Sequence, residues 1–152
     1  MRGSFKLQGF REMDAALAEF PKATGRNILR RTAVEALGPV ADAMQARAPR
    51  AEGDLALAID VGTKRAKRTK KHFPDSSTVE AYAGVRVVGG GMPPQATQQE
   101  FGNENHGPQP FARPGWDQEA APTLERVKDS LGQQIDKARM RAQRKALRAK
   151  RA

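Results

Sequence analysis

The chain has 152 residues, of which 38% are hydrophobic and 29% charged, and its formal net charge is +10 at pH 7. This length predicts one domain with a modest core, part of which depends on neighbouring molecules. The sequence contains no cysteine, which excludes disulfides, thiol catalysis and thiolate metal sites and fits a reducing compartment.

No apolar run is long enough for a signal peptide or for a membrane span. We therefore expect a soluble protein that is made in the cytoplasm. The positive charge indicates a polyanionic environment, such as nucleic acid, an anionic membrane surface or acidic partner subunits. A solvated basic surface with no specific partner is the alternative.

The N-terminal part of the sequence predicts two helices. Residues 8–20 predict a short helix, because large apolar side chains recur at three- and four-residue steps: Phe10, Met13, Leu17 and Phe20. Residues 22–47 predict a longer helix that ends before Pro49. Pro39 lies inside it and predicts a kink or break near residues 37–38, because proline removes one helical hydrogen bond.

The middle of the chain predicts two strands. Residues 55–61 and 79–88 both alternate between apolar and other side chains, which is typical of half-buried strands. The basic segment 64–72 between them predicts an exposed loop, so we expect the two strands to pair antiparallel.

The C-terminal half predicts an irregular segment followed by a long helix. Residues 89–115 are rich in glycine and proline, and a loop of this length is usually functional. Residues 116–150 carry a helical apolar stripe that fades after Asp136 into a basic end without acidic residues. We therefore expect an α+β fold with two N-terminal helices, a small antiparallel sheet, a long irregular loop and a long C-terminal helix.

The same pattern predicts two parts, a domain over residues 1–136 and a basic extension over residues 137–152. A frayed or disordered extension is an alternative, because like charges oppose helix formation.

Residues suited to catalysis are sparse. His72 lies in a lysine run, His106 lies in the glycine- and proline-rich loop, and no hydrolase, zinc or phosphate-loop motif is present. Glu100 and Glu104 could pair for acid–base chemistry, but we expect Glu100 to make a polar contact near a subunit boundary. The sequence therefore predicts no enzyme, no cofactor and no metal site.

Several short passages resemble one protein family. The passages are Ala48-Pro49, Gly53-Asp54-Leu55, Ile59, Tyr82-Ala83, Glu100-Phe101-Gly102 and residues 108–114, PQPFARP. In their order and spacing they resemble the tail-component family of HK-type siphophages, whose members are also described as tail-completion or head–tail joining proteins. The resemblance runs from about residue 8 to about residue 130 and is strongest over residues 109–117, although Ala58 and Asn103 stand where serine and threonine are common.

The resemblance implies a virion protein that forms a ring, expected to be sixfold, at the neck or upper end of the tail. Its implied partners are copies of itself and other neck and tail proteins, with no membrane. It implies no cofactor and no catalytic residue, and it does not extend to the basic end of the chain.

The proline-rich segment is the predicted subunit interface. Its prolines favour an extended backbone that loses little entropy on docking, and aromatic and arginine side chains are common at interface hot spots. Arg113 would pair with an acid of a neighbouring subunit or with Glu100. The predicted interface comprises Glu100, Phe101, Gln109, Pro110, Phe111, Arg113, Pro114 and Trp116. Alternatively, Phe111 and Trp116 cap the core of their own chain.

Two basic segments are predicted to contact genomic DNA in the channel of the ring, or an acidic partner. They are represented by Lys64, Arg65, Lys67, Arg68, Lys70, Lys71, Arg144, Lys145 and Arg148. They contain few aromatic residues, so we expect contact with phosphates and no reading of base sequence. A nucleic-acid-binding protein without sequence preference is the alternative function; a small hydrolase or nuclease is disfavoured because the sequence lacks a suitable acid and metal cluster.

Overall fold

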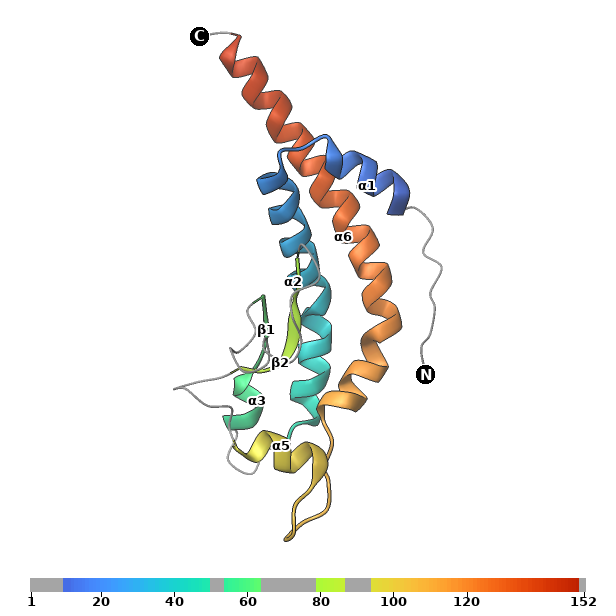
Figure 1. The fold of residues 1–152 in the computed structure, drawn as a ribbon, viewed down its shortest axis with the longest axis vertical. Coiled ribbons are helices and arrows are strands. Elements are labelled where there is room, and N and C mark those ends of the chain that lie inside the picture. The colour runs from blue at the N-terminus through green and yellow to red at the C-terminus, as the bar shows by residue number, and fades with distance from the viewer. Residues whose placement is uncertain (1–9, 50–53, 64–78, 87–93, 151–152) are drawn as a thin grey trace.

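The computed structural model describes residues 10–49, 54–63, 79–86 and 94–150 (Figure 1). Its elements follow in chain order as α1 (Phe10–Ala18), α2 (Lys22–Arg47), α3 (Asp54–Ala58), β1 (Ile59–Gly62), β2 (Tyr82–Val85), α5 (Pro94–Phe101) and α6 (Ala112–Ala149). The predicted α+β class is confirmed, with helices in the majority. The basic loop 64–72 and His72 lie outside the described residues.

Helices α2 and α6 form the long axis of the molecule (Figure 1). They run antiparallel, because Met44 near the end of α2 meets Gly115 near the start of α6. Further along, Glu35 of α2 accepts a hydrogen bond of 2.7 Å from the Ser130 hydroxyl of α6. At about 1.5 Å per residue, the 38 residues of α6 span about 57 Å and extend past α2.

One apolar cluster joins α1 to the N-terminal half of α2 and to the C-terminal half of α6. Its buried members are Ala16, Ile28, Leu131 and Ile135. Met13 and Leu17 of α1 pack against them, as the predicted apolar stripe of the first helix requires. This cluster fixes α1 across the middle of α6.

A second apolar cluster joins the other half of the pair to the sheet and to α5. It contains Val40, Ala41, Met44, Ala48, Leu55, Ile59, Ala96 and Phe111. The sheet is a two-stranded antiparallel ribbon in which Ile59 pairs with Val85 and Gly62 pairs with Tyr82. The predicted antiparallel pairing is confirmed, although the strands are shorter than predicted.

The prediction of a strand over residues 55–61 is wrong for its first half, which is the helical turn α3. Leu55, Ala58 and Ile59 are buried, and this three- and four-residue spacing selects one side of a helical turn. Leu57, which the alternating pattern placed with them, is 80% exposed. A segment of only seven alternating residues is compatible with the period of a strand and with that of a helix. Packing against α2 selected the helix for residues 54–58.

Three further predictions need correction. The predicted break in α2 is wrong, because the helix is continuous through Pro39 and its adjoining turns are held in the core by Ala36 and Val40. Residues 94–101, predicted as irregular, form helix α5. Helix α6 begins at Ala112, four residues before the predicted start, so Pro114 falls in its first turn, where a missing N–H costs little.

Candidate functional site

The start of α6 is held by a side chain from α5. The backbone N–H groups of Phe111 and Ala112 each donate to Oε2 of Glu100 at 2.9 Å. The Arg113 backbone N–H donates to Oε1 at 3.2 Å, and its Nε donates to the same oxygen at 3.0 Å. The first N–H groups of a helix have no partner within it, so the Glu100 carboxylate supplies the cap that α6 itself lacks.

We call these four hydrogen bonds between Glu100 and residues 111–113 the clasp, and they keep Glu100 ionised. Burial of the carboxyl group raises its pKa, but the hydrogen bonds from Ala112, Phe111 and Arg113 together outweigh burial and leave the pKa below its usual value. Both carboxylate oxygens are engaged by donors, whereas Glu104 is exposed in the following turn. Glu100 therefore serves as a structural anchor and not as a free base.

The turn between α5 and α6 is shaped by two residues. Gly102 has a φ of 80°, and a side chain there would meet the Pro108 nitrogen at 3.0 Å. The side-chain oxygen of Asn103 accepts hydrogen bonds from the backbone N–H groups of Asn105 and His106. The turn thus folds back on itself and carries the chain from the end of α5 to Phe111.

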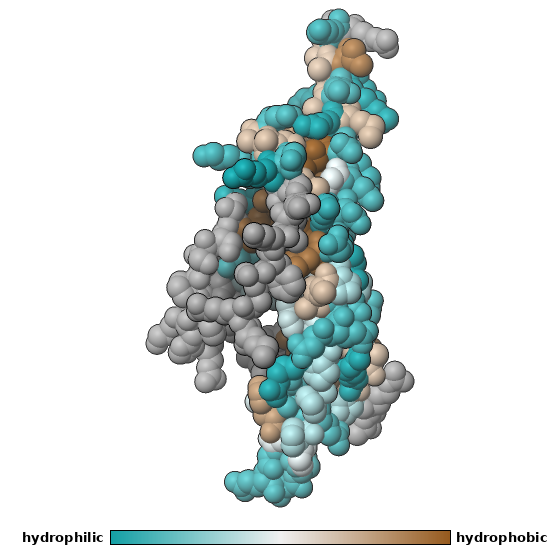
Figure 2. Space-filling model, turned by 90° about the vertical axis from the view of Figure 1, so that its right-hand side faces the viewer, coloured by the Kyte–Doolittle hydropathy of each residue, from teal (hydrophilic) through white to brown (hydrophobic). Residues whose placement is uncertain are grey.

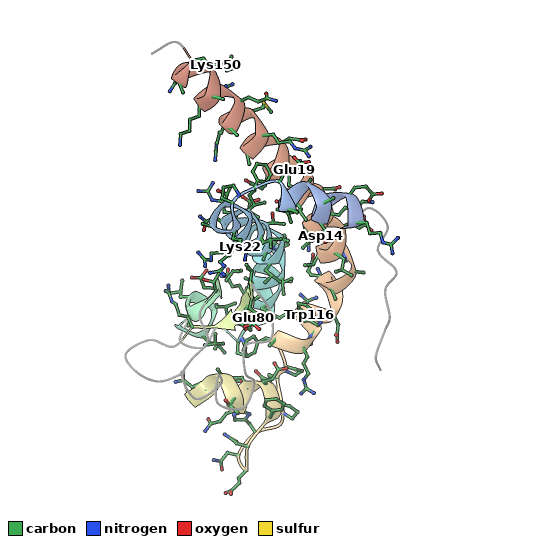
Figure 3. All side chains as sticks on the ribbon, turned by 45° about the horizontal axis from the view of Figure 1, so that its top comes forward. Asp14, Glu19, Lys22, Glu80, Trp116 and Lys150 are labelled. Carbon is green, nitrogen blue, oxygen red and sulfur yellow. The ribbon has the colours of Figure 1, made fainter. Side chains whose placement is uncertain are left out.

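We group three exposed side chains near the start of α6 as the corner patch: Phe101, Arg113 and Trp116. Phe101 is 64% exposed and Trp116 is 46% exposed. The Arg113 guanidinium lies 5.0 Å from the centre of the Phe101 ring, within the range of a cation–π contact. Trp116 follows Arg113 by one helical turn and projects from the start of α6 (Figure 3).

The structure divides the predicted interface residues into two groups. Phe111 is 2% exposed in the core and Glu100 is buried in the clasp, so these two stabilise their own chain. Gln109 and Pro110 are exposed, and Pro114 is partly buried in α6. The predicted pairing of Arg113 with Glu100 is confirmed. The predicted extended backbone is wrong for residues 112–115, because the chain is helical from Ala112.

The basic end of α6 forms a second candidate surface. This end of the chain is helical to Ala149 and continues past α1 and α2 (Figure 1). Residues 139–149 are all exposed. Arg144, Lys145 and Arg148, predicted from charge alone, lie on this helix. Lys137 and Arg141 share their face, and the helical period in the sequence would have identified them.

A shallow apolar hollow of about 370 Å³ lies between α1, α2 and α6. Met13, Leu17 and Leu131 contribute to its wall, and hydrophobic residues reach the surface in the middle of the molecule (Figure 2). Its polar side chains are Thr32 and Asp14. One hydroxyl and one exposed carboxylate do not form a nucleophile–base pair or a set of metal ligands.

Within the described ranges, no group of three or more histidine, aspartate or glutamate side chains could hold a metal ion. Nδ1 of the His106 ring lies 2.9 Å from the carbonyl oxygen of its neighbour Gly107. None of the described helices has an apolar stretch long enough to cross a membrane. Comparisons with protein-family models, curated proteins and solved structures found no match to this chain.

Proposed function

We propose that this chain is a structural subunit of a tailed-phage particle, forming a ring at the neck or upper end of the tail around the DNA channel, and that it is not an enzyme. The observation that carries the proposal is the corner patch, where Phe101, Arg113 and Trp116 are exposed on a rigid support. The family resemblance of the same segment supports the placement in a phage particle.

The patch has the composition of an interface hot spot. Large aromatic side chains and arginine dominate binding energy in protein–protein contacts, particularly where they are ordered before binding. Arg113 is held by Glu100, and Phe101 lies under its guanidinium. Two of the three side chains therefore have little conformational freedom to lose when a neighbouring subunit docks.

The shape of the molecule also suits an assembly. The two apolar clusters lie one after the other along α2 and α6, so the molecule is elongated and has no single compact core. The free end of α6 has no packing partner in the described part of the chain, and an isolated helix of this length is marginal in water. Neighbouring molecules in a ring would supply the missing contacts.

Paired substitution of the corner patch tests the proposal. Phe101→Ala with Trp116→Ala should leave the monomer folded, because neither side chain belongs to an apolar cluster. The paired variant should reduce incorporation into particles at least about 30-fold, the effect of losing about 2 kcal/mol at a hot spot. Quantitative mass spectrometry of purified particles gives the amount incorporated, and circular dichroism checks the fold.

Leu57→Ala is the matched control, because Leu57 is an exposed large apolar residue on a different element, α3. It should not change incorporation. Normal incorporation of the paired variant would contradict the interface assignment, and absence of the wild-type protein from particles would contradict the proposed function.

The charge of the α6 end favours a second candidate, a nucleic-acid-binding protein without sequence preference that acts outside the particle. Residues 137–149 include six lysine and arginine residues and no acidic residue. This candidate requires a monomer or dimer that binds DNA in a salt-sensitive manner and is absent from virions. The same particle measurement separates the two functions.

A further inference from the structure

Five of the basic residues at the end of α6 share one face of the helix, which we call the basic stripe: Lys137, Arg141, Arg144, Lys145 and Arg148. Their spacing of four, three, one and three residues follows the helical period of about 3.6. The stripe extends about 16 Å along the helix at about 1.5 Å per residue.

Two other basic residues of this region, Arg139 and Lys150, lie on the opposite side of the helix from the stripe. Arg139 faces the body of the molecule, where its guanidinium donates to both carboxylate oxygens of Glu19 at 3.1 and 3.0 Å. Lys150 follows Arg139 by eleven residues and so lies on the same side, away from the stripe. Arg139 is thus neutralised within the chain, whereas none of the described acidic side chains is within ion-pair distance of the stripe.

The positive charges of the stripe repel one another and destabilise the helix, and a bound polyanion would relieve this repulsion. Like charges three and four residues apart destabilise a helix, and the stripe contains several such pairs, among them Lys137 with Arg141 and Arg144 with Arg148. A second copy of the same stripe would add further repulsion. A partner with negative charges spread along the length of the stripe would remove this repulsion.

An anionic membrane fits less well than nucleic acid. A helix that lies in a membrane surface needs a continuous apolar face, usually with aromatic residues. Met140 and Leu147 are the large apolar residues of this exposed segment, and polar Gln143 lies between them on their side of the helix. Duplex DNA presents about one phosphate charge per ~1.7 Å of axis and requires no apolar contact.

We propose that the basic stripe binds the phosphate backbone of duplex DNA without reading its sequence. The side chains are lysine and arginine, which contact phosphates, and residues 137–149 include no aromatic side chain for stacking on bases. This inference rests on the proposed function, because the ring would bring the channel DNA to the helix. The binding itself is a property of the isolated full-length protein and is tested separately from assembly.

Two variants of equal charge test the stripe. Arg141→Gln with Arg148→Gln removes two charges from it, and Arg139→Gln with Lys150→Gln removes two charges from the opposite side of the same helix. Binding to a fluorescent duplex is measured by anisotropy between about 50 and about 200 mM salt. The fall in affinity over this range should be about 12-fold smaller for the stripe variant than for the wild type, since each lost phosphate contact lowers the salt slope by about 0.9.

The control variant should keep the salt dependence of the wild type. Equal effects of both variants would overturn the proposal, because binding would then follow total charge. Absence of binding by the wild type would also overturn it, as would tighter binding to single-stranded RNA or to vesicles of phosphatidylcholine and phosphatidylserine. Particles that contain a wild-type protein unable to bind DNA would overturn this inference and leave the proposed function intact.

Discussion

A single carboxylate, that of Glu100, joins the end of α5 to the first turn of α6. It accepts from three consecutive backbone N–H groups, those of Phe111, Ala112 and Arg113, and from one arginine side chain. Buried backbone donors that lose their partner cost about 1–3 kcal/mol each to leave unsatisfied. The position of Phe111 in the core and of Arg113 in the corner patch both depend on this one side chain.

Glu100→Gln should therefore lower the free energy of unfolding by about 1–3 kcal/mol at neutral pH, because an amide nitrogen cannot accept the hydrogen bonds that one carboxylate oxygen receives. The pKa of Glu100 is lowered in the folded chain, so its contribution is present above the pKa of the unfolded chain and is lost as the pH falls through the folded value. Urea unfolding of wild type and variant across acidic and neutral pH measures both effects.

The difference between wild type and Glu100→Gln should shrink as the solution becomes acidic. Glu104→Gln is the control, since Glu104 is exposed in the turn between α5 and α6, two residues after Gly102, and it should change stability by less than about 0.5 kcal/mol. A difference that is the same at all pH values would show that the Glu100 charge does not stabilise the fold.

Phe111 shows why exposure decides which residues test an interface. It is 2% exposed and belongs to the cluster of Val40 and Met44, so truncating it to alanine costs about 3–5 kcal/mol of folding free energy. Loss of assembly by such a variant would follow from unfolding. Phe101 and Trp116 test assembly directly, because their side chains contribute little to the core.

At the scale of elements, a close approach of α2 and α6 depends on Gly115. A Cβ at this position would lie 2.8 Å from Cγ and 3.0 Å from the backbone nitrogen of Met44. The nitrogen belongs to the α2 backbone and cannot move aside as a flexible side chain can. A glycine at this position lets the two helices meet where α6 begins.

Gly115→Ala should destabilise the fold by about 1–3 kcal/mol, because the added methyl group forces the two helices apart. Gly132→Ala is the matched control on the same helix, where the added atom would meet only the Met13 methyl group at 3.9 Å. This control should stabilise the fold by roughly 0.5–1 kcal/mol, since alanine favours a helix over glycine. Thermal unfolding of both variants gives the comparison, and equal shifts in the same direction would contradict the close approach.

At the scale of the whole molecule, the described chain divides into a packed body and a projecting helix. Ile135 is the last residue of α6 that is buried in a cluster, and Arg139 makes the last ion pair with the body. The sequence predicts a boundary between domain and basic extension at residue 136. The projecting part contributes charge to the surface and no packing to the core.

Ending the chain after Arg141 should change the free energy of unfolding by less than about 0.5 kcal/mol, because residues 142–149 are exposed and make no contact with either cluster. Urea unfolding with a tryptophan fluorescence readout from Trp116 measures this quantity. A larger loss of stability would mean that the projecting helix packs against the body.

The sequence by itself determined the features that depend on local period and charge. The spacing of apolar residues placed α1 and α2, and the run of glycines and prolines separated the sheet from α6. These features can be predicted because a helix and a strand each repeat apolar residues with their own period, whereas a solvated segment is polar and has no such period. The pairing of β1 with β2 followed in the same way from two alternating runs and a polar connection.

Only the tertiary structure decided the burial of individual side chains. Phe111 and Trp116 are both aromatic and lie five residues apart, yet Phe111 is buried against α2 and Trp116 is 46% exposed. Residues 55–58 became helical, although their sequence also suits a strand. The reason is physical: burial and the capping of α6 by Glu100 depend on contacts between segments far apart in the chain, which no local repeat encodes.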